Sequence, residues 1–140
     1  MKPMFRKAMV VSAIAGLGLA ALPVAAHHTA SMFESVKIVQ LTGTITEVRW
    51  TNPHVNVMVN ASLKSGGNAA PWLLEMTSPG NLTRNGWTKT SLKPGDKVVL
   101  EINPLKDDSA NGGRLVKATV VDTGQVFTTN YKELEAEGRY

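Results

Sequence analysis

The sequence predicts an all-β fold, a closed barrel of five strands with one short helix between the third and fourth strands. Five segments alternate apolar and polar residues with a period of two, which is typical of half-buried strands. Turns rich in glycine, proline and asparagine separate these segments, and one helix start follows the third. Because no strand–helix–strand repeat is present, this order favours a barrel of the oligonucleotide/oligosaccharide-binding (OB) type.

The first strand is predicted over residues 36–51. Apolar side chains alternate with threonines as far as Ile45, after which Val48 and Trp50 fall on the threonine side. A β-bulge or bend near Glu47 would return them to the apolar face. We therefore expect a long, coiled first strand.

The second and third strands are predicted over residues 54–61 and 71–77. Each should have one face toward the core and one away from it. The expected core faces are formed by Val55, Val57 and Val59 in the second strand and by Trp72, Leu74 and Met76 in the third. The opposite faces carry His54, Asn56, Met58 and Asn60 in the second strand and Glu75 in the third.

A short helix is predicted to begin at Ser78, because serine is a good N-cap and Pro79 suits the first helical position. Gly86 limits its length, and Leu82 and Trp87 are its expected anchors in the core.

The fourth and fifth strands are predicted over residues 97–103 and 114–122, separated by a loop over residues 107–113. Their expected core faces are Val98, Leu100 and Ile102 in the fourth strand and Val116, Ala118 and Val120 in the fifth.

Most of the net positive charge of the chain lies in a segment that is predicted to be a targeting signal. The 140-residue chain has 15 basic and 11 acidic residues, a formal charge of +4. Lys2, Arg6 and Lys7 precede an uncharged apolar run that ends in small residues at Ala26. This pattern predicts a secretory signal peptide over residues 1–26, with an uncleaved anchor as the alternative. Cleavage would leave 12 basic and 11 acidic residues.

The predicted mature protein is periplasmic or secreted and keeps no stable membrane anchor. It divides into an N-terminal extension over residues 27–35, a barrel over 36–127 and a charged tail over 128–140. The absence of cysteine excludes disulfides, zinc–thiolate sites, iron–sulfur clusters and thiol catalysis. Dispersed basic residues and export both argue against nucleic acid as a partner.

The histidines suggest a metal site. Cleavage after Ala26 would make His27 the first residue, and its α-amine and ring Nδ1 can chelate one metal ion. His54 would supply a third nitrogen, with His28 as an alternate ligand. Since amine and imidazole nitrogens suit Cu(II), copper or a similar ion is the expected ligand. The alternatives are incidental affinity of the chain terminus and a His54 that only caps its turn.

Other residues are candidates for supporting roles. Met58 shares a predicted face with His54 and has a thioether suited to Cu(I), although methionines more often fill the core. Glu75 is the single charge in an apolar strand; it would accept a hydrogen bond from a histidine ring or pair with Arg84, or else lie solvated outside the barrel. Trp50, Asn52 and His54 form a candidate contact patch, while the scattered tryptophans favour core roles.

No convincing catalytic set is present. The chain lacks a Ser–His–Asp arrangement at usable spacing, a glycine-rich phosphate loop and an HExxH motif. Asp107-Asp108 lacks the glycine and spacing of a calcium loop. We therefore expect a binding protein, with a copper-dependent oxidase as a fainter alternative.

Short motifs follow one another from His27 to about Asn103. They are His27-His28-Thr29, Phe33-Glu34, Gly43-Thr44-Ile45-Thr46, Trp50-Thr51-Asn52-Pro53-His54, Trp72 with Glu75, Ser78-Pro79, Leu82 with Arg84, Gly86-Trp87 and Leu92-Lys93-Pro94-Gly95-Asp96. In this order they resemble a family of small exported bacterial proteins classed only as a domain of unknown function. The chain departs from that pattern at Thr29, Glu34 and the loop Lys106-Asp107-Asp108. The resemblance implies an exported β-rich domain and brings no established activity.

The leading hypothesis is a non-enzymatic periplasmic protein that binds copper or a similar ion through His27 and His54. The alternative is an interaction module that docks on another envelope protein or a glycan without metal. The sequence leaves the oligomeric state open.

Overall fold

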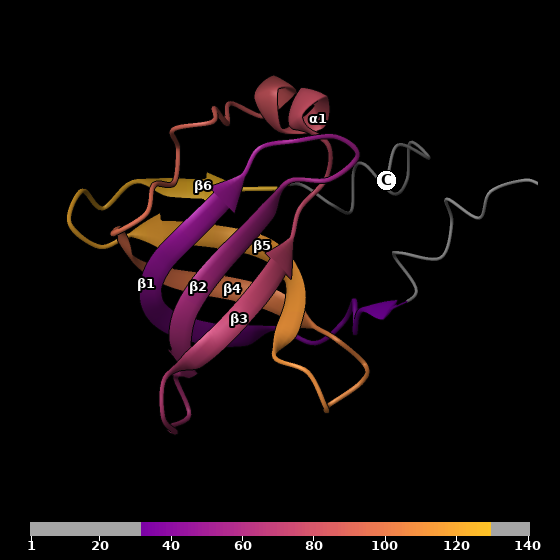
Figure 1. The fold of residues 1–140 in the computed structure, drawn as a ribbon, viewed down its shortest axis with the longest axis vertical. Helices are drawn as coiled ribbons and strands as arrows, with labels where there is room; N and C mark the ends of the chain where they lie inside the picture. Colours follow the sequence, from indigo (N-terminus) through magenta and orange to yellow (C-terminus); the bar gives the residue numbers. More distant parts are fainter. Residues whose placement is uncertain (1–31, 130–140) are drawn as a thin grey trace, which may run out of the picture.

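A computed structural model describes residues 32–129 of the chain (Figure 1). The signal peptide predicted over residues 1–26, His27, His28 and residues 130–140 of the tail lie outside this range. The elements, in chain order, are β1 (Val39–Arg49), β2 (Asn56–Leu63), β3 (Ala70–Glu75), α1 (Pro79–Arg84), β4 (Lys97–Pro104), β5 (Gly112–Val120) and β6 (Val126–Thr128).

The first five strands close into a barrel, which confirms the predicted fold class. β1 is antiparallel to both β2 and β4, β2 pairs with β3, and β4 pairs with β5. A parallel pairing of Leu73–Glu75 in β3 with Gly112–Arg114 in β5 completes the ring. The single helix α1 connects β3 to β4 and lies at one end of the barrel, near the β1–β2 connection (Figure 1).

β1 bends at the predicted position. Its register against β2 shifts between Ile45 and Glu47, as expected for a bulge that returns the later apolar residues to the core side. Gly43 sits earlier in the strand, opposite Ala61 on one side and Val98 on the other. A Cβ atom there would meet the carbonyl oxygen of Asn60 and lie 2.6 Å from the Cα of Ala61. The glycine therefore permits the close approach of β2 to β1.

The core is filled from the predicted inward faces. Val55, Val57, Leu74, Val98 and Leu100 are fully buried. Helix α1 has Ser78 as its N-cap, since the serine side chain accepts from the backbone N–H of Asn81, and Leu82 and Trp87 are buried as expected. Nε1 of Trp87 also donates to the Thr128 carbonyl at 2.7 Å, and its ring lies 4.9 Å from that of Phe127.

Two details of the last strands differ from the sequence prediction. β6 was not predicted, because three residues are too few to show an alternation. In β5 the register against β4 shifts between Glu101 and Ile102, so Ile102 lies opposite Leu115 and Glu101 opposite Lys117. The extra residue, Val116, is half-buried, and Leu115 takes the fully buried position in its place. No helix within residues 32–129 has the length and apolarity needed to cross a lipid bilayer.

We predict that Gly43→Ala lowers the free energy of unfolding by about 1–3 kcal/mol, the usual cost of forcing an extra carbon into a packed site. The matched control is Gly80→Ala in α1, where the nearest atom to the new Cβ would be 3.7 Å away, on the flexible Arg84 side chain. That variant should be neutral or more stable by about 0.5–1 kcal/mol. Urea unfolding measures both, and equal stability of the two variants would contradict the close packing at Gly43.

Candidate functional site

A histidine and a carboxylate meet at one end of the β2–β3 pair. Nδ1 of His54 lies 2.7 Å from Oε1 of Glu75, and the two side chains are 26% and 23% exposed. The two strands bring them together because their ladder continues past Asn56: Val55 donates its N–H to the Thr77 carbonyl, and Met76 donates to Val55. Asn56 lies opposite Glu75 and donates through Nδ2 to the His54 carbonyl at 3.2 Å, which fixes the histidine backbone.

This geometry decides which nitrogen of the His54 ring is available to bind a ligand. A carboxylate at Nδ1 favours the proton on that atom, so Nε2 is the nitrogen that would coordinate a metal or accept a proton. Metal-bound histidines commonly have such a carboxylate behind them, where it orients the ring and raises its basicity. His54 and Glu75 therefore have the arrangement of one metal-binding histidine and the carboxylate that orients it.

The structure separates several of the other residues that the sequence singled out. Arg84 does not pair with Glu75 within the described residues; its Nη1 donates to the Gly80 carbonyl on its own helix at 3.2 Å. Met58 lies on the same face as His54, but four residues farther along the strand, about 13 Å away. One metal ion cannot bind both side chains.

Trp50 and Asn52 lie in the same β1–β2 connection as His54. Trp50 is half-buried and packs against the core, while Asn52 is exposed and precedes a cis peptide bond to Pro53. Trp72 is also half-buried against the core and Trp87 is fully inside it, so the tryptophans serve mainly in packing.

Within residues 32–129 no group of three or more His, Cys, Asp or Glu side chains is placed to hold a metal ion. His27 and His28 lie outside this range. A metal site at His54 would therefore need ligands from the segment that precedes Met32, from the tail, or from another molecule.

Sequence reasoning missed a buried polar cluster near this pair. Arg114 is only 2% exposed and donates through Nε and Nη2 to Oδ1 of Asn103, at 3.3 and 3.1 Å. Asn103 is buried as well, and the guanidinium carbon of Arg114 lies 5.9 Å from the centre of the Phe33 ring. One signal in the sequence was the pair of glycines before Arg114, which marks a place where chains approach closely.

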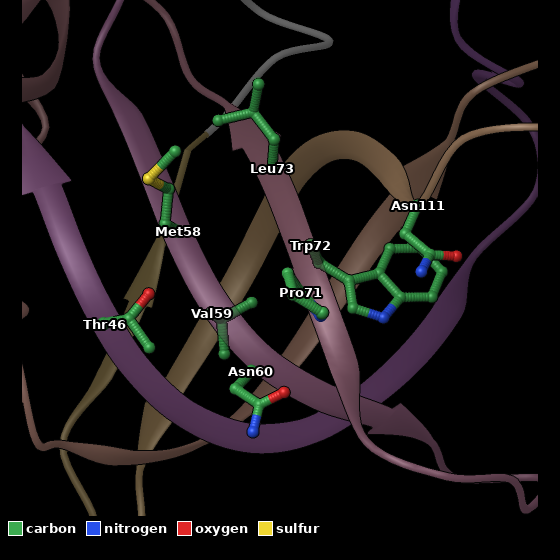
Figure 2. Close-up of a pocket in the computed structure, with 8 residues that line it drawn as sticks. All are labelled: Thr46, Met58, Val59, Asn60, Pro71, Trp72, Leu73 and Asn111. Atoms are coloured by element: carbon green, nitrogen blue, oxygen red, sulfur yellow. The ribbon is translucent and has the colours of Figure 1, made fainter.

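A separate pocket of about 280 Å³ lies on the outer face of β1–β3 (Figure 2). The residues that line it are all uncharged: Thr46, Met58, Val59, Asn60, Pro71, Trp72, Leu73 and Asn111. Glu47, opposite Met58, bonds to Nε of Arg49 at 2.6 Å. That hydrogen bond lowers the pKa of Glu47 and raises the pKa of Arg49, so the charges beside the pocket are paired with each other.

Residues 15–114 match the model of one protein family, described as a family of unknown function, DUF6152. The chain belongs to this family. The resemblance predicted from the motifs, to a family without an assigned activity, is thus confirmed. The part matched to DUF6152 includes His27, His28, His54 and Glu75 and ends at Arg114. Neither the curated proteins nor the solved structures gave a match.

We predict that replacing Glu75 changes the tautomer of His54. In the unaltered protein the neutral ring should carry its proton on Nδ1, because the Glu75 carboxylate lies 2.7 Å from that atom. Glu75→Leu should move the proton distribution toward Nε2, as seen in the ¹⁵N chemical shifts of the ring. Glu101→Leu, which removes a carboxylate bonded to Lys117 instead, serves as the control. An unchanged tautomer in Glu75→Leu would show that the carboxylate does not orient the ring.

Proposed function

We propose that this domain is a non-enzymatic binding protein for a metal ion, with Cu(II) as the preferred ion. Nε2 of His54 would be one ligand, and the α-amine and ring of His27 would be two others, with His28 as an alternate. The observation that carries the proposal is the 2.7 Å contact between Nδ1 of His54 and Glu75. A histidine that only capped its turn would need no carboxylate behind the ring.

The choice of ion follows from the ligands that the chain contains. It has no cysteine, and Met58 lies too far from His54 to add a thioether. Amine and imidazole nitrogens remain, and these favour Cu(II) over the other common divalent ions. We also propose that binding follows export, because only cleavage after Ala26 would create the α-amine of His27.

A chain that begins at His27 should bind Cu(II) more tightly than a peptide of its first residues, since His54 adds a nitrogen. His54→Ala should weaken binding at least tenfold, and Glu75→Gln by about 10–100-fold, the usual effect of removing a carboxylate behind a ligand. Competition titration gives the affinities, and EPR gives the number of coordinated nitrogens.

The controls for this experiment are Met58→Leu, which should bind normally, and a chain that retains residues 1–26, which has no α-amine at His27 and should bind weakly. The proposal fails if the His27 chain binds no better than the peptide and His54→Ala changes nothing.

The pocket on the outer face favours a second candidate function, the binding of a neutral glycan. Its uncharged lining combines an apolar surface from Met58 and Leu73 with the amides of Asn60 and Asn111 (Figure 2). Such a surface suits a sugar ring, which has an apolar face and a rim of hydroxyl groups. Pro71 on β3 has no N–H to offer, which disfavours a peptide strand added at this part of the sheet.

For the glycan candidate we predict binding to neutral rather than anionic sugars on a glycan array, unaffected by a metal chelator. Leu73→Asp should abolish this binding, because it places a charge on the apolar part of the pocket. His54→Ala should leave it intact, since His54 does not line the pocket. Loss of glycan binding in His54→Ala, or retention in Leu73→Asp, would place the sugar elsewhere.

A further inference from the structure

We propose that Asn111 is a modification site, at which the side-chain amide is lost by spontaneous deamidation and a carboxylate takes its place. The reaction adds a negative charge to the uncharged pocket on the outer face of β1–β3, which Asn111 lines (Figure 2). The effect on ligand binding rests on the glycan candidate described above, whereas the chemical step does not depend on it.

Asn111 is followed by Gly112, and an asparagine before a glycine is well suited to this reaction. A glycine has no Cβ, so its backbone nitrogen is open to attack the preceding side chain. The nitrogen of Gly112 forms a bond to Cγ of Asn111 and closes a succinimide ring, while Nδ2 leaves as ammonia and takes the proton of the Gly112 N–H. Water then opens the ring at either carbonyl, which gives aspartate or isoaspartate.

A second asparagine–glycine pair, Asn85-Gly86, lies at the end of α1 and provides a comparison within the same chain. Asn85 is half-buried, and its Nδ2 donates to the Asn81 carbonyl at 3.2 Å. The N–H of Gly86 donates to the Thr83 carbonyl at 3.1 Å. The leaving amide and the attacking nitrogen are therefore both held in hydrogen bonds at this pair.

At Asn111 the hydrogen bonds involve the carbonyl groups instead. The Asn111 carbonyl accepts from the N–H of Leu73, and the Gly112 carbonyl accepts from the N–H of Leu105, both at 3.1 Å. Neither bond uses the Gly112 N–H, and no hydrogen bond found within residues 32–129 involves the Asn111 side chain. The two bonds restrain the backbone, but they lie where β5 begins, and the ends of strands open more readily than their centres.

The fold itself requires the glycine that makes Asn111 reactive. A Cβ at Gly112 would lie 2.6 Å from the Leu105 side chain, so a larger residue does not fit there. On the other side of the pair, residues 106–111 are all exposed, and Asn111 is the last of them before β5. The Asn111 side chain can therefore turn toward the Gly112 nitrogen without displacing any residue of the core.

The products change the chemistry of the pocket. No residue that lines it carries a charge, and the neighbouring Glu47 is bonded to Arg49. Aspartate and isoaspartate each add one carboxylate and remove the two N–H donors of the amide. A neutral sugar bound here would take that carboxylate out of water without neutralising it, which costs free energy. Because ammonia is lost, each molecule makes this change only once, and an ageing population should lose glycan binding.

The chemical step is tested by incubating the full chain in mildly alkaline buffer and following both asparagines by peptide mass spectrometry, with enzymatic methylation to detect isoaspartate. We expect Asn111 to react about tenfold or more faster than Asn85, whose hydrogen bonds must open first. In urea the two rates should become similar, since the fold no longer separates the pairs. Asn111→Gln, which would need a larger ring, should stay intact. Equal rates in the folded protein, or a faster reaction at Asn85, would overturn the proposal.

The effect on binding is tested with Asn111→Asp, which carries the charge of the product. It should bind neutral glycans about tenfold more weakly than the unaltered protein. Asn68→Asp adds the same charge on an exposed loop residue outside the pocket and should bind normally. Normal binding by Asn111→Asp would overturn the effect of deamidation on the pocket. If the unaltered protein binds no glycan, the glycan function fails, while the masses still decide whether Asn111 is the modified residue.

Discussion

Three residue pairs between β3 and β5 close this barrel, and the candidate site depends on them. Leu73–Glu75 pair in parallel with Gly112–Arg114. The two glycines let β5 lie close against the end of β4: a Cβ on Gly113 would lie 2.7 Å from the Asn103 carbonyl oxygen, and one on Gly112 would lie 2.6 Å from the Leu105 side chain. Closure then places Glu75 next to Arg114, although β3 and β5 lie at opposite ends of the antiparallel strand order β3–β2–β1–β4–β5.

The inward side chains of β1–β5 are buried together in one core. Both candidate sites lie outside that core, on the outer face and at the ends of strands. The His54–Glu75 pair lies where β2 begins and β3 ends, and the uncharged pocket lies farther along the same two strands, around Met58 and Leu73. About 13 Å of strand separates His54 from Met58, so the two sites can be altered independently.

Alternation along the chain was enough to predict the five barrel strands, most of their faces and the bulge near Glu47, and the Ser78-Pro79 pair was enough to predict the helix. Alternation failed where two adjacent residues are both apolar: Leu115 and Val116 fit the core position equally well, and only the register against β4 decides between them. Alternation could not predict the burial of Arg114 either. An arginine at the start of a strand is normally exposed, and this one is buried because Phe33, from 81 residues earlier in the chain, covers it.

The same reasoning placed His54 and Glu75 on polar faces of neighbouring strands, but it could not set the register between them. A slip of one residue would turn Glu75 into the core and leave the histidine without a carboxylate. The valines of β2 and Leu74 of β3 prevent that slip, since each would have to leave the core. Hydrophobic packing thus fixes the geometry of a polar pair. In the proposed metal site, the barrel would set one ligand through this register, and cleavage of the predicted signal peptide would create another by exposing an α-amine. The complete amine-containing site would then form only in the exported, folded chain.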